Sequence, residues 1–335
     1  MDLATRYLGL ELLHPLIASA SPLTSTVEGI RVLEDAGAAA VVMPSLFEEQ
    51  IRAEDTAYAM YTEHGSYSQS EAGSYFPELS AYDRGVSGHL DTVRRAVDAV
   101  DIPVIASLNA TTTEGWVDYA ARLEQAGAAA LELNMYFIPT DASISGHEVE
   151  ARYVEVVGAV KRTVKIPVAV KLSQFFSSTG NIAHKLAGAG ADGIVLFNRF
   201  YQPDFDLATL SIKADLKLSS SHEAGPSLLW IALLAGRLDC SLAATSGVET
   251  ADQVVKYLLV GADAVMTTSA LLRHGPAYMR TLVSGLVAWL EQNSHPSVRA
   301  VRGIKSVKRL DNVADLLRAQ YVSLITEYVP GQLAA

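Results

Sequence analysis

The side chains best suited to chemistry follow a series of short apolar runs along the chain. Lys171 stands near the end of the run IPVAVKL, and Asn134 and Asn198 end the runs AALELN and DGIVLFN. A lysine in an apolar run must either reach solvent or meet an anion, because an unpaired buried ammonium costs several kcal/mol. An amine and two amides at three successive run ends are more than ordinary solvation of such ends predicts. We therefore expect a ligand site here.

A structural interpretation of Lys171 stays open beside the functional one. In the run 129–134, the alternation of a strand places Glu132 and Asn134 on the same face. If that face lines an interior, the Glu132 carboxylate can neutralise Lys171 in an ion pair. We prefer the functional interpretation, in which Lys171 contacts a ligand.

A second signal lies in the last third of the chain. The motif ATSGVET leads into a predicted helix, and TTSALL follows another apolar run. The backbone N–H groups of a glycine-containing turn and of a helix N-terminus together form a common phosphate site. Either turn alone is weak evidence, because tight turns favour glycine in any case. Together, the two turns predict a phosphorylated ligand.

A recurring Gly-Ala motif indicates which elements position these residues. Gly-Ala stands just before an apolar run four times, at 37–38, 127–128, 190–191 and 261–262. Such a glycine is typical of a residue with positive φ after a helix, and each run is short enough for a buried strand. Four further runs have the same composition. The predicted strands are 15–20, 39–45, 102–108, 129–134, 166–172, 192–198, 240–246 and 263–269.

Helical patterns lie between these strands. Three pairs of residues fit a capping box, in which side chains and backbone satisfy each other's donors: Ser25 with Glu28, Thr111 with Glu114, and Thr250 with Gln253. Eight strands that alternate with helices favour an α/β fold, a closed (β/α)8 barrel of the TIM type, over an open doubly wound sheet. Such barrels carry their chemistry at the carboxyl ends of the strands, where the polar residues lie.

We expect one barrel domain over residues 1–335, because barrels of this type run to roughly 200 to 400 residues as one unit. Two connections, 47–88 and 199–226, are too long for ordinary loops and follow the second and sixth strands. They are predicted to be insertions that form walls or a lid at the rim. Residues 296–335 are predicted to form a C-terminal helical extension.

Composition excludes several function classes. The net charge of −11 disfavours nucleic acid and membrane surfaces as partners. No run approaches the roughly 20 apolar residues of a spanning helix, and residues 1–14 carry charges where a signal peptide would be apolar, so a cytoplasmic protein is expected. Cys240 is the only cysteine, which excludes an internal disulfide and an iron–sulfur or multi-cysteine zinc site built by this chain alone. No metal site is predicted.

These motifs resemble the dihydroorotate dehydrogenase family. They occur in the family's order and span roughly residues 5–290. The matching segments are PLIASASP at 15–22, ELN at 132–134, VKL at 170–172, Asn198 after the sixth predicted strand, TSGVET at 245–250 and TTSAL at 267–271. The resemblance implies a TIM barrel with FMN at its rim, an oxidoreductase of pyrimidine metabolism that acts on a small-molecule substrate, and a homodimer.

By position, the resemblance also implies roles for individual residues. The implied cofactor-binding residues are Ala18 and Ser19 beneath the flavin, Asn134 at the ring or its substrate, Lys171 by the flavin N1 and C2 carbonyl, Asn198 at the substrate face, and Ser246, Gly247, Thr268 and Ser269 at the phosphate. Reduction of a flavin places negative charge near N1, which a fixed ammonium stabilises. Lys171 is therefore predicted to tune the cofactor.

The chain departs from the family around the substrate. After ELN the family carries a short serine, cysteine, proline and asparagine stretch that supplies its catalytic base, whereas this chain reads MYFIPT at 135–140. Whether Phe137 or Ile138 takes the base position, neither side chain can accept a proton. A family lysine is also replaced around 43–45, and an asparagine-bearing motif is replaced at 73–78. A substrate other than dihydroorotate is therefore predicted.

Three functions are compatible with the sequence. The preferred one is an FMN oxidoreductase acting on a CH–CH or related bond, with Tyr136 as a candidate acid, although an ordinary tyrosine pKa of about 10 makes it a poor base. The second is a catalytically silent FMN-binding or electron-relay protein with a separate electron-transfer subunit. The basic residues of 299–309 could dock such a partner, although we prefer to interpret them as a solvated helix face. The third is a flavin-free phosphate-binding lyase whose Lys171 forms a Schiff base, which requires a lowered lysine pKa.

Overall fold

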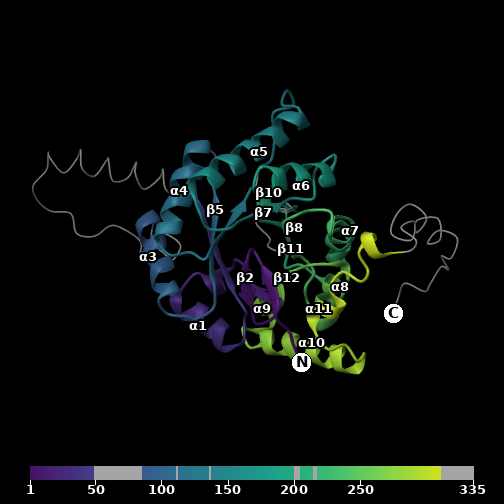
Figure 1. Cartoon of the computed structure of the whole chain (residues 1–335). Helices are drawn as coiled ribbons and strands as arrows, with labels where there is room; N and C mark the ends of the chain where they lie inside the picture. The colour runs from purple at the N-terminus through teal and green to yellow at the C-terminus, as the bar shows by residue number, and fades with distance from the viewer. Residues whose placement is uncertain (49–84, 111, 136, 200–203, 214–216, 311–335) are drawn as a thin grey trace, which may run out of the picture.

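The computed structural model describes residues 1–48, 85–110, 112–135, 137–199, 204–213 and 217–310. Within these ranges, eight parallel strands close into a barrel with helices around it (Figure 1). In order around the barrel the strands are β3 (Leu16–Ala18), β4 (Val41–Phe47), β5 (Val104–Asn109), β6 (Ala130–Asn134), β7 (Val168–Leu172), β8 (Gly193–Leu196), β11 (Ser241–Ala244) and β12 (Ala264–Thr267), which pairs with β3. The predicted (β/α)8 barrel is confirmed, and the open sheet is excluded.

Helices alternate with the strands as predicted. The longer ones are α1 (Val27–Asp35), α3 (Gly85–Val97), α4 (Thr113–Gln125), α5 (Gly146–Thr163), α6 (Thr179–Gly188), α7 (Ala224–Leu234), α8 (Ala251–Val260) and α10 (Tyr278–Gln292). The short ones are α9 (Ser269–His274), α11 (Val298–Val301) and 3-10 turns at Pro22–Thr24, Ser221–Glu223 and Val307–Arg309. None of the helices in the described ranges is long and apolar enough to cross a bilayer.

Local signals at the helix ends are mostly where the sequence predicts them. The glycines of the recurring Gly-Ala motif, at positions 37, 127, 190 and 261, have φ of 87°, 94°, 104° and 116°. This positive φ lets the chain turn directly from helix to strand. Gln253 accepts a hydrogen bond from the N–H of Thr250, as predicted. Two caps lie one residue later than predicted: Thr26 instead of Ser25 at α1, and Thr112 instead of Thr111 at α4.

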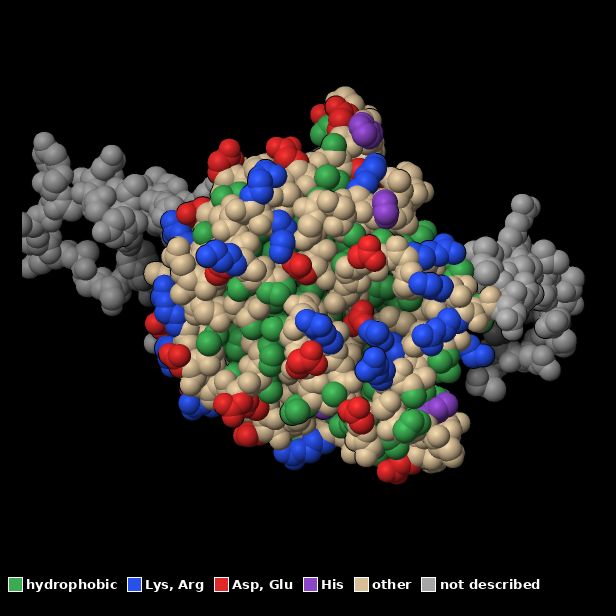
Figure 2. Space-filling model, in the orientation of Figure 1, with side chains coloured by type: hydrophobic (Ala, Val, Ile, Leu, Met, Phe, Trp, Pro, Cys, Tyr) green, Lys and Arg blue, Asp and Glu red, His purple; other side chains and the backbone are tan. Residues whose placement is uncertain are grey.

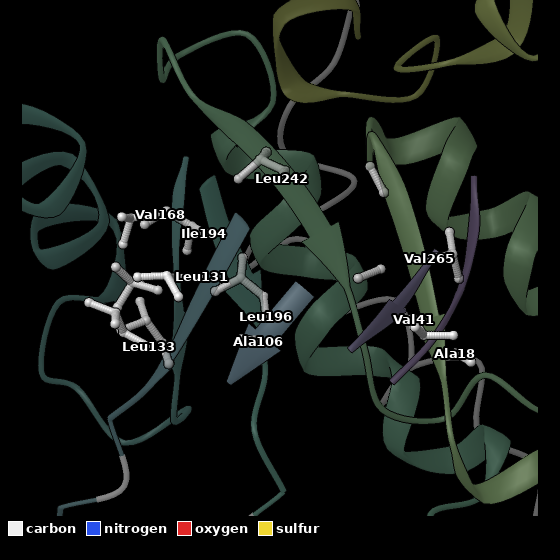
Figure 3. Packing of buried hydrophobic residues seen from close by; sticks show 14 of the residues in the cluster. Ala18, Val41, Ala106, Leu131, Leu133, Val168, Ile194, Leu196, Leu242 and Val265 are labelled. Atoms are coloured by element: carbon white, nitrogen blue, oxygen red, sulfur yellow. The ribbon is translucent and has the colours of Figure 1, made fainter. Parts of the chain in front are cut away.

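Side chains alternate across the wall of the barrel. One set points outward, under the helices, and belongs to the larger core cluster; Leu131, Val168, Ile194 and Leu242 are examples (Figure 3). The other set fills the interior and includes Ile17, Val42, Ile105, Ala130, Ala169, Val195, Ala243 and Met266. Both faces of each strand are buried, which explains why the runs are almost continuously apolar.

A hairpin that the sequence analysis missed closes the amino-terminal end of the barrel. Strand β1 (Thr5–Tyr7) pairs antiparallel with β2 (Leu10–Leu12), and Tyr7 and Leu8 pack into the interior cluster. The N–H of Leu8 donates to the side chain of Ser241, the first residue of β11. Figure 1 shows this hairpin in purple across the barrel. Strands of three residues are too short for periodicity to reveal them.

The two predicted insertions follow β4 and β8. Residues 49–84 of the first lie outside the described residues, and α3 begins at Gly85. The second contains a hairpin of β9 (Asp204–Asp206) and β10 (Ser211–Lys213), with 200–203 and 214–216 outside the described residues. Of the predicted C-terminal extension, α11 and the turn Val307–Arg309 are described and residues 311–335 are not.

His14 fixes the approach to β3 with both of its ring nitrogens. Its Nε2 donates to the carbonyl of Gly37 at 2.7 Å, and its Nδ1 accepts from the N–H of Leu16 at 3.2 Å. A protonated ring cannot accept the second bond. Burial disfavours the charged ring as well, so the pKa of His14 lies below its ordinary value.

We expect the His14 contribution to stability to be lost as the pH falls below about 6.5, because the unfolded chain then binds a proton that the folded ring resists. In His14→Gln, the decrease in the free energy of unfolding between about pH 7.5 and about pH 5.5 should be smaller than in the wild type, measured by urea unfolding. The exposed His184 provides the control His184→Gln, which should retain the wild-type decrease. An equal decrease in all three proteins would contradict the assignment.

Candidate functional site

A cavity of about 350 Å³ opens at the carboxyl ends of the strands. Its volume lies in the range of small-molecule sites, about 300 to 1,000 Å³. Six of the nine predicted cofactor residues line it: Ser19, Lys171, Asn198, Ser246, Thr268 and Ser269. They come from the ends of β3, β7, β8, β11 and β12. The lysine and the turns after β11 and β12, found separately in the sequence, therefore share one cavity.

Lys171 forms a buried ion pair and lines the cavity at the same time. Its Nζ lies 3.2 Å from Oε1 of Glu132, and the two side chains are 9% and 1% exposed. The pairing of β6 with β7 sets Asn134 opposite Lys171 and Glu132 opposite Ala169. Both interpretations of the sequence thus describe part of the arrangement. Lys171 has a carboxylate partner and still lines the cavity.

A chain of hydrogen bonds links four positions at the mouth of the barrel. Ser107 and Ser45 are 2.8 Å apart at their hydroxyl oxygens, and Asn134 donates to Ser45 at 3.2 Å. Asn198 in turn donates to Oδ1 of Asn134 at 2.7 Å. Asn134 is therefore oriented at both ends of its amide, and it holds Asn198 at the cavity wall. The serines were not among the predicted site residues, and their only sequence signal is polarity near a strand end.

The turns after β11 and β12 are joined through the second insertion. Ser246 and Gly247 have φ of 74° and 69°, so the backbone turns sharply after β11. The hydroxyl of Ser219 accepts from the N–H of Gly247 at 3.4 Å and lies 2.9 Å from the hydroxyl of Ser269. Thr268 is the N-cap of α9 but makes no side-chain capping bond. The first N–H groups of α9 are thus left without a side-chain cap, beside the cavity.

The returning end of the second insertion forms one wall of the cavity. Lys217, Leu218 and Ser219 all line it. The segment is anchored by Arg273, which donates to the carbonyl of Leu218 at 3.0 Å, and by Glu249, which accepts from the N–H of Ser221 at 3.1 Å. Ser219, which connects both turns, could not be predicted because its partners lie 28 and 50 residues away in the chain.

The other predicted site residues lie around the cavity without lining it. The Ala18 side chain belongs to the outer core cluster, beneath the helices (Figure 3). Asn134 reaches the cavity through Asn198, and Gly247 contributes its backbone to the turn. The candidate acid Tyr136 lies outside the described residues.

The two residues at the predicted base position have apolar side chains. Phe137 is half-buried and packs under the guanidinium of Arg152, whose Cζ lies 4.8 Å from the ring centroid. Ile138 is 50% exposed. Neither residue can act as an acid or base. Nearby Tyr153 donates to the carbonyl of Met135, and burial raises the pKa of Tyr153 to about 12.

Comparison with known proteins identifies the family. The protein-family model described as dihydroorotate dehydrogenase matches residues 68–290 of this chain. The chain belongs to the dihydroorotate dehydrogenase family. The resemblance inferred from the motifs is thereby confirmed, and the arrangement of the barrel agrees with it.

The curated relatives that match this chain are named as dihydroorotate dehydrogenases. A protein of Aeropyrum pernix assigned as a dihydroorotate dehydrogenase A (fumarate) is 30% identical over 219 residues, which cover 62% of this chain and 69% of the relative. The dihydroorotate dehydrogenase B (NAD(+)) catalytic subunit of Pyrococcus abyssi is 26% identical over 302 residues, 88% of this chain and 96% of the relative. The corresponding subunit of Pyrococcus furiosus is 26% identical over 312 residues, 91% and 99% of the two chains.

Gly247 gives a direct test of how the cavity wall is built. A Cβ at this position would lie 2.7 Å from the backbone N of Ala224 and 2.9 Å from the carbonyl oxygen of Ser220, in addition to the strain of its positive φ. Because both contacts are with backbone, Gly247→Ala should lower the free energy of unfolding by about 1–3 kcal/mol, measured in urea.

Gly225 is the matched control, since a Cβ there meets nothing within 4 Å. Gly225→Ala, in the first turn of α7, should leave stability unchanged or slightly raised. If Gly247→Ala were as stable as Gly225→Ala, the close approach of the insertion to the turn after β11 would be refuted.

Proposed function

We propose that this chain binds FMN in the cavity at the strand ends and oxidises or reduces a CH–CH or related bond of a small molecule other than dihydroorotate. One observation carries the proposal: Lys171 on β7 and the turns after β11 and β12 line the same cavity. Strands β8 and β11 stand between β7 and β12, so the ammonium and the second turn belong to different sectors of the mouth. Such a separation suits a ligand with a phosphate at one end and an electron-accepting ring at the other.

The donor set supports a phosphate at the turns. Ser246, Gly247, Thr268 and Ser269 would hold it with backbone N–H groups and hydroxyls, and α9 has no side chain capping its N-terminal N–H groups. Glycine at 247 permits the close backbone approach that such a site needs. These groups offer several hydrogen-bond donors, which fits a phosphate monoester.

The other sector supports a flavin ring. Lys171 would lie by N1 and the C2 carbonyl, with Ser19 beneath the ring and the linked amides of Asn134 and Asn198 toward the substrate. When bound, the flavin supplies hydride transfer at its N5. The residues of this chain orient the ring, stabilise charge near N1 and exclude water.

The substrate is proposed to differ from the one in the names of the relatives. Phe137, packed against Arg152, and the exposed Ile138 leave the expected base position without a proton acceptor. At the end of β4 the small polar Ser45 is bonded to Ser107 and Asn134, so this corner of the mouth holds neutral groups. A site with these features favours a substrate whose proton transfer uses another group.

Of the other functions considered, the lyase is disfavoured by a specific contact. A Schiff-base lysine must have its amine free to attack a carbonyl, whereas the Nζ of Lys171 is held by the Glu132 carboxylate at 3.2 Å. A silent or electron-relay role is kept as an outcome of the test below. The homodimer and the separate electron-transfer subunit belong to the proposal as expectations; several relatives are named catalytic subunits.

The proposal is tested by incubating the purified protein with FMN, removing free cofactor and recording the absorption spectrum and the mass of the released ligand. We expect a yellow protein that releases FMN and is not bleached by dihydroorotate without oxygen, but is bleached by a compound from a panel of small molecules with oxidisable CH–CH bonds. Failure to retain FMN would overturn the proposal. Bleaching by dihydroorotate would overturn its substrate part, and bound FMN that nothing reduces would point to the silent or relay role.

A further inference from the structure

Glu132 is a buried carboxylate to which the proposed function assigns no role. It lies on β6, is 1% exposed, and pairs with Lys171 through Oε1 at 3.2 Å. Its second oxygen, Oε2, has no hydrogen-bond partner among the described residues. The hydroxyl of Tyr7, from the hairpin that closes the barrel, is likewise buried and unpartnered within the described part of the chain. Burial and the Glu132 charge both raise the pKa of Tyr7 well above its ordinary value, so the ring and the carboxylate interact.

This arrangement is unfavourable for stability alone. A carboxylate loses several kcal/mol of hydration when it is buried, and one ion pair with a half-satisfied carboxylate recovers only part of it. The neighbours that point into the same interior, such as Ile105, Ala169 and Met266, show that apolar side chains fill this space well. A role that depends on the charge of Glu132 would account for it.

Lys171 is the group on which that charge acts. Lys171 lines the cavity and Glu132 does not, and the two charges together are neutral. The field of a neutral pair falls off faster with distance than the field of a single ammonium, and in a buried site the difference is little screened. Glu132 therefore holds the ammonium at the cavity wall and weakens the positive potential that reaches a ligand there.

We propose that Glu132 is a positioning residue that sets the electron affinity of the bound flavin through Lys171. The inference rests on the proposed FMN function. With Glu132 charged, the positive potential of Lys171 at the flavin N1 is partly cancelled, and reduced FMN is stabilised only modestly over oxidised FMN. With Glu132 neutral, the full charge of Lys171 acts on N1 and favours the reduced, more negative ring.

The test compares Glu132→Gln with the wild type, both loaded with FMN. We expect the variant to bind reduced FMN relative to oxidised FMN about tenfold more tightly, which raises the midpoint potential of this two-electron couple by about 30 mV. Sulfite is an independent probe, because its addition to N5 of oxidised flavin leaves negative charge near N1. Its affinity, read from the loss of the flavin absorption band, should also rise about tenfold.

Two variants serve as controls. Glu150 on α5 pairs with Lys185 at 3.1 Å and does not line the cavity, so Glu150→Gln removes a paired carboxylate elsewhere and should leave sulfite affinity at the wild-type value. The double variant Glu132→Gln, Lys171→Met restores a neutral pair and should lose the tighter sulfite binding of the single variant. If Glu132→Gln does not fold, Glu132→Asp, with a shorter reach to Lys171, should show a smaller increase in the same direction.

The outcomes separate this inference from the proposed function. A wild-type protein that retains no FMN overturns the proposed function and, with it, the inference. FMN bound to the wild type with equal sulfite affinity and potential in Glu132→Gln and Glu150→Gln overturns the inference alone. Equally tight sulfite binding in the single and double variants would also overturn it, because the effect would then not pass through Lys171.

Discussion

Burial of every barrel strand on both faces is the constraint on which the rest of the structure depends. The outer faces pack under the helices and the inner faces fill the interior, so a strand has no position where a polar side chain meets solvent until its carboxyl end. Polar groups at those ends are therefore gathered in one place, around one cavity. A charged group deeper in the wall must find its partner within the barrel, as Lys171 does in Glu132.

The same constraint explains why the fold could be read from the sequence. Runs such as IPVIASL and IPVAVKL are continuous because both faces are covered, and the glycines at 37, 127, 190 and 261 mark the turn from helix to strand. Each signal is local, since it depends on residues within one helix end or one strand. The caps at Thr26 and Thr112 were misplaced by one residue because neighbouring hydroxyls offer alternative caps of nearly equal quality.

The features that the sequence did not predict depend on contacts between segments that are distant in the chain. The hairpin of residues 5–12 is specified by packing in the barrel, with Leu8 bonded to Ser241, more than 200 positions away. Ser45 belongs to the site because the register of β4 and β5 brings it to Ser107. Ser219 lies in the second insertion and connects the turns after β11 and β12 through Gly247 and Ser269. Each of these serines has an unremarkable sequence context, so only the tertiary structure distinguishes it from a solvated residue.

Under the proposed function, the site combines a ligand cradle with a reaction corner that lacks the expected base, and the two are held by different contacts. The turns after β11 and β12 are held by Ser219, Tyr257 and the returning insertion, since Tyr257 donates to the carbonyl of Ser246 at 2.7 Å. The segment at 135–138 depends on other contacts, those of Tyr153 with Met135 and of Arg152 with Phe137. The two sets of contacts involve different residues. On the proposed function, replacing the proton acceptor would therefore leave the cradle intact, so that a member of this family could keep a cofactor-binding geometry while its substrate chemistry diverges.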